Sequence, residues 1–464
     1  MSPLSGCITA EQPDLALAIP AAYRDAATTS RAALPSPDWW RSFRSRELSG
    51  LVEAAELGNL DIAAAIARVI QADAQARIVG AALLPNVGLS ASASRSRASQ
   101  ATGTRLGGTG GPSERNLFSA ALGASYELDF WGKNRSTLLA AEQNAIATRF
   151  DRETVALTIM GAVANAYFQV LAAQDRLRYA RENIASANRV LTVIRQRLEV
   201  GTASSLDVAQ QESVLNTQRA VVPTLEQTLR QNTAALSVLI GRAPEFVRVR
   251  GGSMFSLAIP RLTPGIPAEL LTRRPDIRAA EADLAGANAN VAAARAAFFP
   301  SIELTAQGGV QASVFRWLTR PEAAAWQAAA GLTQPIFDGG RLQGQLDLQK
   351  GRQDELLQIY RRTVIQAFAD VDSALVATRQ LAARERLQND VVQSSRRAFQ
   401  IAEQRLNEGT VDIISVLNTQ QTLFQAQDTL AQVRLARLQA TVGLFQALGG
   451  GWGAETARKQ ATRQ

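Results

Sequence analysis

The most restrictive feature of the sequence is an uninterrupted helical run from about Asn134 to Val200. Between Arg135 and Glu199 it contains no proline and only one glycine, Gly161, and good helix formers dominate it. Aliphatic residues recur at every seventh position, as in a coiled-coil seam: Val170, Leu177, Ile184, Leu191 and Leu198. At 1.5 Å per residue the helix would be roughly 100 Å long, which predicts an elongated structure rather than a compact domain.

The sequence contains this long helix twice. The first run breaks after Val200, and a second helix returns from Leu206. The segment 404–410 repeats the Gln-Arg-Leu and Gly-Thr residues of the segment 196–202, again between a long helical run and a returning one. An internal tandem repeat is therefore predicted.

Each repeat is predicted to contain an opening helix, a pair of strands and a long helical hairpin. The strand pairs are expected at 86–97 with 117–130 and at 301–314 with 325–337, and the hairpins at 134–240 and 341–448. The opening helix of the first repeat is expected to run unbroken through Leu48, Leu51 and Ile62 to about Leu83. The chain then divides into an N-terminal arm (1–48), the first repeat (49–246), an inter-repeat segment (247–263), the second repeat (264–448) and a C-terminal tail (449–464).

The predicted strands alternate apolar and polar side chains, which gives each strand one apolar and one polar face. In 301–314, for example, Ile302, Leu304 and Val310 alternate with polar residues such as Glu303. This pattern suits either a half-buried soluble sheet or the wall of a membrane barrel, and periodicity alone does not decide between them. Four strands are too few to close a barrel, and a bilayer excludes open edges. A membrane barrel would therefore need several chains, with two giving eight strands and three giving twelve.

Composition excludes most catalytic and metal-binding chemistry. The chain has no histidine and one cysteine, which removes imidazole catalysis, Cys–His nucleophiles, His or Cys metal clusters and an internal disulfide. The net charge of +8 is spread along the helices, without the clustered basic patch that nucleic acid requires. No uninterrupted apolar run of 18 residues predicts a transmembrane helix. We therefore expect no enzyme, no metal site and no nucleic-acid partner. The acids Glu127 and Asp129 lie two apart on one strand face, as lumen residues of a barrel would.

The lone cysteine, Cys7, ends the small-residue pattern Leu-Ser-Gly-Cys, which is typical of the lipid-modified cysteine of bacterial lipoproteins. The charged start and apolar stretch of a signal segment are missing before it. Two interpretations remain open. Either the sequence starts inside the real signal and Cys7 carries a lipid, or Cys7 is an incidental thiol.

Several motifs, in order along nearly the whole chain, carry a resemblance to a known family. They are Trp39-Trp40, Tyr126-Glu127-Leu128-Asp129-Phe130-Trp131-Gly132, Arg273-Arg274-Pro275-Asp276-Ile277, Ala296-Ala297-Phe298-Phe299-Pro300-Ser301 and Gln334-Pro335-Ile336-Phe337-Asp338-Gly339-Gly340. With these motifs the chain resembles the outer-membrane factors of the TolC superfamily, in particular the NodT-type, OprM-like efflux lipoproteins.

The resemblance implies an α+β membrane protein that assembles as a homotrimer. Its expected parts are a twelve-stranded β-barrel in the outer membrane, an α-helical barrel in the periplasm, and an equatorial belt made of the arm, the inter-repeat segment and the tail. The expected partners are a periplasmic adaptor (a membrane fusion protein), an inner-membrane RND transporter and outer-membrane lipid. A covalent lipid on Cys7 is expected in place of any cofactor.

The resemblance also assigns roles to the two hairpin tips. In the family these loops meet the adaptor, which implies contacts at Gly201, Thr202, Gly409 and Thr410. Without the family, the two glycines would be interpreted as helix C-caps. Just beyond the second loop, OprM-like channels narrow the pore with a Leu, Asp and Arg set, and the matching positions here are Ile414, Asn418 and Gln421.

These three positions are spaced i, i+4 and i+7, so they share one helix face. The hydrophobic member is kept, whereas the charged pair is replaced by two amides. The closed state is therefore expected to depend on Ile414 packing and amide hydrogen bonds, and to be less sensitive to salt than an ionic latch. Asp207 and Asp412, near the tips, are expected to supply carboxylate rings instead.

The predicted function is the outer-membrane channel of a tripartite RND-type efflux system, a passive exit duct for drugs or other small molecules. Two alternatives in the same class are a duct for type I protein secretion and one for metal export. The absence of histidine, with only three methionines, argues weakly against metal export. An alternative from a different class is a soluble periplasmic coiled-coil scaffold.

Overall fold

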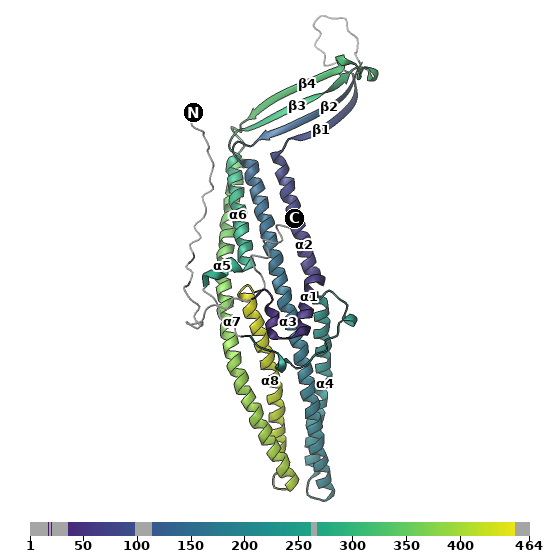
Figure 1. Cartoon of the computed structure of the whole chain (residues 1–464), viewed down its shortest axis with the longest axis vertical. Helices are drawn as coiled ribbons and strands as arrows, with labels where there is room; N and C mark the ends of the chain where they lie inside the picture. The colour runs from purple at the N-terminus through teal and green to yellow at the C-terminus, as the bar shows by residue number, and fades with distance from the viewer. Residues whose placement is uncertain (1–16, 18–19, 21–35, 98–113, 261–266, 451–464) are drawn as a thin grey trace. The chain divides into compact units, whose positions relative to one another are not determined.

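A computed structural model of the chain, drawn in Figure 1, describes residues 17, 20, 36–97, 114–260 and 267–450. The chain forms two compact units, and each unit takes residues from both repeats. The strand unit comprises the described residues of Arg68–Thr148 and Ala280–Tyr360, and the hairpin unit those of Ala16–Ala67, Arg149–Ala279 and Arg361–Gln464.

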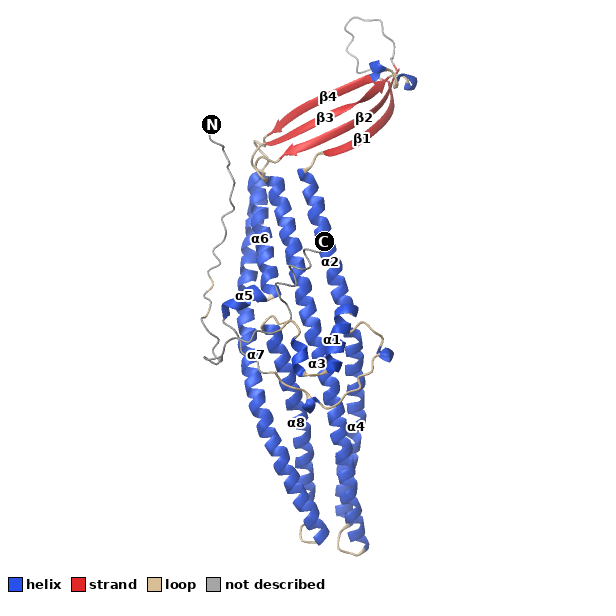
Figure 2. Cartoon of the chain, viewed as in Figure 1, coloured by secondary structure: helices blue, strands red, loops and turns tan. Residues whose placement is uncertain are grey.

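The strand unit contains one four-stranded antiparallel sheet, drawn in red in Figure 2. Its strands lie in chain order and are β1 (Asn86–Arg97), β2 (Glu114–Leu128), β3 (Ser301–Ala312) and β4 (Ala324–Thr333). Strands β2 and β3 belong to different repeats and pair directly, with Tyr126 opposite Leu304. The four predicted strands are confirmed, and the two strand pairs join into a single sheet.

The strand register sorts the side chains of the sheet onto two chemically different faces. One face is apolar and includes Val87, Leu89, Phe118, Leu122, Tyr126, Ile302, Leu304, Val310, Trp326 and Leu332. The other face is polar and includes Ser90, Ser92, Ser119, Ser125, Glu127, Glu303, Thr305, Gln307, Gln311 and Gln327. The apolar face is uncovered in the described chain, since Leu89 is 78 % and Trp326 85 % exposed. Such a face needs an apolar environment.

Asp129 does not lie on the polar face of the sheet, which corrects the expectation from its spacing. Strand β2 ends at Leu128, one residue earlier. The Asp129 carboxylate instead accepts hydrogen bonds from the backbone nitrogens of Asn134 and Arg135, at 3.0 and 2.9 Å. It therefore satisfies free N–H groups at the start of a helix, where a carboxylate is stabilising. Only Glu127 of the pair stays on the polar face, 2.5 Å from the Lys133 amine.

Long helices dominate the rest of the chain. They are α1 (Arg46–Gly58), α2 (Leu60–Gly80), α3 (Lys133–Glu199), α4 (Ser205–Leu239), α5 (Leu270–Arg273), α6 (Pro275–Ala296), α7 (Arg341–Glu408) and α8 (Ile413–Ala447). Helices α3 and α7 are 67 and 68 residues long, and each is followed by a returning helix of 35 residues. The predicted pair of long hairpins is confirmed.

The opening helix of the first repeat is broken, contrary to the expectation of one continuous helix. Asn59 adopts an extended backbone between α1 and α2. Its side-chain oxygen accepts hydrogen bonds from the backbone nitrogens of Asp61 and Ile62, and its side-chain nitrogen donates to the Leu239 carbonyl at 2.7 Å. A buried asparagine that caps a new helix and binds a distant carbonyl makes this break favourable.

The hairpin unit has an aromatic and aliphatic core around the middle of α3. Trp39 stacks on Phe445 with ring centroids 5.0 Å apart, and both pack with Phe43 and Phe168. One 18-residue window of α3 is apolar enough to cross a membrane, with a mean hydropathy of 1.6, but 72 % of it is buried inside the fold. This burial among the core residues accounts for its apolar composition.

Candidate functional site at the hairpin tips

The two hairpins close with the same turn. Gly201 and Gly409 adopt φ of 75° and 77°, a left-handed conformation that glycine adopts without strain. In each turn the glycine N–H donates to the carbonyl three residues before it, and the following threonine N–H donates to the carbonyl five residues before it. This is the Schellman pattern that ends helices. The Thr202 and Thr410 hydroxyls also donate to the Arg197 and Arg405 carbonyls respectively.

The two acidic residues near the tips cap the returning helices. The Asp207 carboxylate accepts from the Ser204 backbone nitrogen at 2.7 Å, and the Ser204 hydroxyl accepts from the Asp207 nitrogen, which completes a capping box. Asp412 accepts from the Ser415 nitrogen at 2.6 Å, and this bond lowers the pKa of its carboxyl below the ordinary value. Both carboxylates thus have a structural partner, and the predicted carboxylate rings stay a prediction.

The three predicted gate residues share an exposed face of α8. Ile414 is 57 % exposed, and Asn418 and Gln421 are also exposed. On the opposite side of the same turns, Val416 and Gln420 are fully buried against the other helices. The geometry thus agrees with a common direction for the three side chains, and their role as a gate remains a prediction.

The two tips pack against each other within one chain. Buried side chains from α3, α7 and α8 meet behind them: Val190, Ile194, Phe399, Ala402, Leu406, Val416, Leu423 and Phe424. Arg197 of the first hairpin reaches the second turn, so closely that a Cβ on Gly409 would lie 2.8 Å from its Nη2 atom. The structure therefore brings the loops of both repeats, which carry the predicted adaptor contacts, to one end of the hairpin unit (Figure 1).

A buried polar stripe on α8 was missed by the sequence reasoning. Gln420, Gln427, Arg434 and Thr441 recur at every seventh residue and are between 0 % and 9 % exposed. Gln211 is fully buried at a similar position on α4, four residues before the core residue Leu215. The heptad spacing of these polar residues was the available signal. From sequence alone, however, a polar stripe is indistinguishable from a solvated helix face.

Arg434 ties α8 to the inter-repeat segment. Its three guanidinium nitrogens donate to the Met254 carbonyl at 3.3 Å, the Glu385 carboxylate at 3.0 Å and the Leu257 carbonyl at 2.7 Å. Glu385 also accepts from Arg437 at 2.7 Å. All three nitrogens of this buried guanidinium donate hydrogen bonds, which are strong and directional because the group is charged. They hold α8 against α7 and against the segment that joins the repeats.

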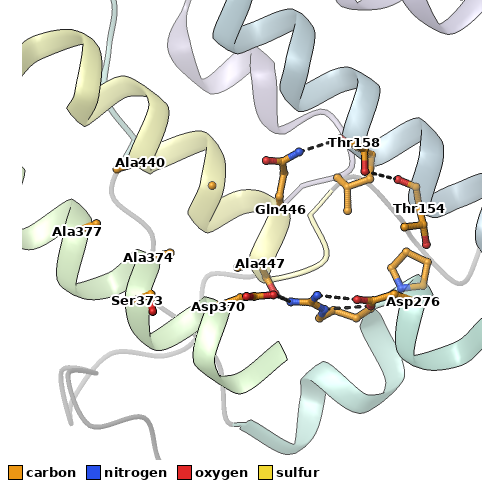
Figure 3. Close-up of a pocket in the computed structure, with 14 residues that line it drawn as sticks. Thr154, Thr158, Asp276, Asp370, Ser373, Ala374, Ala377, Ala440, Gln446 and Ala447 are labelled. Atoms are coloured by element: carbon orange, nitrogen blue, oxygen red, sulfur yellow. Dashed lines mark hydrogen bonds and ion pairs between the residues drawn. The ribbon is translucent and has the colours of Figure 1, made fainter. Parts of the chain in front are cut away.

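A crevice of about 510 Å³ lies in the hairpin unit where α3, α6, α7 and α8 converge (Figure 3). At its edge, Arg274 pairs with Asp276 at 2.6 Å and with Asp370 at 3.0 Å, and it reaches the Ala447 carbonyl. Burial disfavours the charged guanidinium, but the bonds to Asp276 and Asp370 outweigh this and raise the pKa of Arg274. These contacts fasten α6 to α7 and to the end of α8, so the Arg-Pro-Asp motif has a structural role here.

Packing against Gln446, one of the residues that line this crevice, explains the glycine in the middle of α3. A Cβ on Gly161 would lie 2.1 Å from the side-chain nitrogen of Gln446. Gln446 uses that nitrogen to donate to the Leu157 carbonyl across the two helices. The lone glycine of the long helix therefore makes room for a neighbouring side chain.

No group of three or more His, Cys, Asp or Glu side chains that could hold a metal ion occurs within 36–97, 114–260 and 267–450. Cys7, the predicted lipid-attachment residue, lies outside the described residues.

Comparison with known proteins places this architecture among outer-membrane channels. A family model described as outer membrane efflux protein matches residues 51–242 and 266–450, one segment for each predicted repeat. The pyoverdine export outer membrane protein OpmQ of Pseudomonas putida is 40 % identical over 454 residues, which cover 98 % of this chain and 96 % of that protein. The toluene efflux pump outer membrane protein TtgF of the same species is 34 % identical over 416 residues, covering 89 % and 85 %.

The fold matches solved channel structures over nearly its whole length. The outer-membrane channel OprN is 28 % identical, with a TM-score of 0.88 over 96 % of this chain and 99 % of that chain. The CmeC outer membrane channel of Campylobacter jejuni is 26 % identical, with a TM-score of 0.87 over 97 % of each chain. The expected α+β tandem-repeat fold is thus confirmed, and the relatives named here are channel and efflux proteins rather than enzymes.

Proposed function

Because the chain belongs to the outer membrane efflux protein family, we propose that it is the passive exit duct of a tripartite, RND-type efflux system in the outer membrane. In this proposal a periplasmic adaptor joins the duct to an inner-membrane transporter, which supplies the driving force. The duct itself provides a continuous polar path and a gate.

The observation that carries the proposal is the two-faced, open-edged sheet. Its apolar face is exposed along all four strands, while the polar side chains of the other face are those of serine, threonine, glutamine and glutamate. Lipid outside and water inside a barrel would satisfy both faces. A soluble scaffold would leave Leu89 and Trp326 in water, which argues against that alternative.

The edges of the sheet favour assembly of several copies. Within the described residues, β1 and β4 each pair on one side only, with β2 and β3 respectively. A bilayer does not tolerate unpaired strand edges, so β1 of one copy is proposed to pair with β4 of the next. Three copies of the 4-stranded sheet give twelve strands, an even number within the range of outer-membrane barrels.

The finer assignments follow from the family and remain proposals. Gly201, Thr202, Gly409 and Thr410 are proposed to contact the adaptor, and Cys7 to carry the lipid anchor. Ile414, Asn418 and Gln421 are proposed to narrow the periplasmic opening, with Asp207 and Asp412 close by. For the cargo, the relatives named for pyoverdine export are 40 % identical and the toluene efflux protein 34 %. We therefore favour a pyoverdine-like secreted small molecule over organic solvents.

A cross-linking experiment tests the strand closure directly. In a Cys7→Ala background, one cysteine is placed on β1 (Ser90→Cys) and one on β4 (Gln327→Cys), both on the polar face. The protein is expressed in a Gram-negative host from the full reading frame, and isolated outer membranes are treated with a short bis-maleimide. We expect covalent dimers and trimers on a denaturing gel, and no larger species.

The matched controls are the two single-cysteine variants, which should stay monomeric on the same gel. Recovery of the uncross-linked chain as a soluble monomer or dimer would contradict the duct and favour the scaffold. Mass spectrometry of the protein with Cys7 intact shows whether a lipid is attached, independently of the strand pairing.

A further inference from the structure

Helix α8 is fastened firmly near its middle and weakly near the tip. At the middle, all three nitrogens of Arg434 are bonded, and Asp428 pairs with Arg176 of α3 at 2.6 Å. Closer to the tip, one side-chain hydrogen bond joins α8 to the first hairpin among the described residues, from Gln211 Nε2 to Gln420 Oε1 at 3.2 Å. Between this bond and Asp428, the Ala426 carbonyl also accepts a hydrogen bond from Gln388 of α7 at 3.1 Å, and the other contacts of α8 there are mainly apolar.

The orientation of the Gln211–Gln420 pair is fixed by its surroundings. Gln211 Nε2 also donates to the Ala187 carbonyl of α3 at 2.9 Å, so the nitrogen and not the oxygen must face this carbonyl. Gln420 must then present its oxygen to the same nitrogen. As a result, Gln211 Oε1 and Gln420 Nε2 are buried without a hydrogen-bond partner in the part of the chain that the structure describes.

This arrangement costs stability but specifies position. Both glutamines are 0 % exposed, and burying unpaired polar atoms is unfavourable. In a coiled-coil core, a polar residue at a seam position fixes register at the expense of stability. The hydrogen bond between the two side-chain amides is directional and is lost when α8 slides or turns against α4, whereas the apolar side chains around it can repack.

The pair lies close to the predicted gate residues of α8. Gln420 is adjacent to Gln421 and is buried on the side of α8 that faces away from Ile414 and Asn418, which are exposed. The stretch of α8 from Ile413 to Gln427 is about 20 Å long at 1.5 Å per residue. A small rotation about the fixed middle of the helix therefore moves the gate residues by several ångströms.

We propose that Gln211 and Gln420 are a positioning pair for the end of α8 that carries the predicted gate residues. Their hydrogen bond holds this end in its closed position, and breaking the bond lets the end move. The Arg434 cluster serves as the fixed point. The single hydrogen bond between the two side-chain amides holds the tip of α8 in register with the first hairpin. The two buried atoms without a hydrogen-bond partner, Gln211 Oε1 and Gln420 Nε2, destabilise this closed state enough to let it open. The inference rests on the proposed duct function and concerns the opening of its periplasmic end.

The test compares three variants of the full-length protein, purified in detergent and inserted in planar lipid bilayers. Gln211→Leu leaves Gln420 with no partner, so conductance should rise several-fold and the melting temperature should fall. Gln420→Leu leaves Gln211 bonded to the Ala187 carbonyl, so a smaller rise is expected. The double variant replaces the pair by an apolar contact, and it should melt above the wild type and conduct less.

The matched control is Thr441→Val, which alters the same polar stripe on the other side of Arg434 and should leave conductance unchanged. If the double variant changes the melting temperature but all three variants conduct as the wild type does, the pair has only a packing role and the inference is overturned. If neither the wild type nor Gln211→Leu conducts, the duct itself fails, and with it the inference.

Discussion

The two hairpins have the same length and the same closing turn, yet one returning helix is buried and the other is largely exposed. Helices α4 and α8 both have 35 residues and follow a glycine with φ near +76°. Five residues of α4 are buried, compared with sixteen of α8. The residues of each turn therefore determine its conformation, whereas packing against other helices gives α4 and α8 different degrees of burial. Helix α8 is a core element of the hairpin unit, and α4 has a face left for solvent or for neighbouring copies.

A proline marks the same difference. Pro223 lies inside α4, where it is exposed, and the equivalent position of α8, eighteen residues after the helix start, is the fully buried Ala431. An interior proline removes a backbone hydrogen bond and crowds the preceding turn. Helix α4 tolerates this because its face there is open, whereas α8 has no room.

Exchanging the proline between the hairpins should have the largest effect. Ala431→Pro should destabilise the protein by about 4 to 6 kcal/mol, from roughly 3 for an interior proline and 1 to 3 for crowding a packed core. Pro223→Ala should instead stabilise it by about 2 kcal/mol, because α4 regains its hydrogen bond. Thermal unfolding of the detergent-solubilised protein measures both changes. Equal effects of opposite sign would mean that burial does not distinguish the two helices.

The second largest difference in stability is expected between the loss of a buried ion pair in the second hairpin and the loss of an exposed ion pair in the first. Arg434→Ala leaves two backbone carbonyls without their buried donor and leaves Glu385 paired with Arg437 alone, so we expect a loss of about 3 kcal/mol. The matched variant in the first hairpin is Arg195→Ala, whose pair with Glu212 is about half exposed and should contribute less than about 1 kcal/mol. Chemical unfolding monitored by tryptophan fluorescence compares them. Similar losses would show that Arg434 is not the fixed point of α8.

The closing turns are the part in which the two hairpins are most alike, and substitution of their glycines tests this similarity. Gly201→Ala and Gly409→Ala should each cost about 1 to 2 kcal/mol, since alanine is strained at positive φ. Gly409→Ala should cost a few tenths more, because its new Cβ meets Arg197. Thermal unfolding again measures the difference. Combining each variant with Arg197→Ala is the control, and it should remove the excess at Gly409 only.

The smallest expected effect is a pH dependence at the second tip. The Ser415 N–H holds the pKa of Asp412 below its ordinary value of 3.8. A group with a lowered folded pKa stabilises the fold above its unfolded pKa, and this contribution is lost as pH falls through the folded value. Hydrogen exchange at the start of α8 should therefore accelerate in acid below pH 3.8, after correction for the intrinsic rate. Asp412→Ser keeps a cap that does not titrate, so it should abolish the acceleration.

Several features of the fold were predictable because they are set by neighbouring residues. The heptad of α3, with Val170, Leu177 and Leu191 now buried, gave the long helix, and the Gly-Thr turns gave its end. Alternation along 301–314 gave a strand with one apolar face. The tip of the candidate site could be located in the same way, since its glycines and caps depend on contacts within a few residues.

Other features depended on partners distant in sequence. The break at Asn59 needs the Leu239 carbonyl, and the position of Asp129 depends on where β2 ends. The pairing of β2 with β3 across the repeats could not be read from either strand, because both present the same alternation. Gln211 and Gln420 are polar in the sequence and buried in the fold, and only the packing of α4 against α8 reveals them as a pair.

The sequence by itself thus determined the helices, strands, turns and the repeat, because periodicity and backbone preference act over a few residues. Only the tertiary structure decided how far each returning helix is buried and which of its polar residues lie inside, since burial depends on the surface presented by a distant neighbour. For this reason the two hairpins carry nearly the same turn sequence, yet one holds the buried polar stripe and the other an exposed proline.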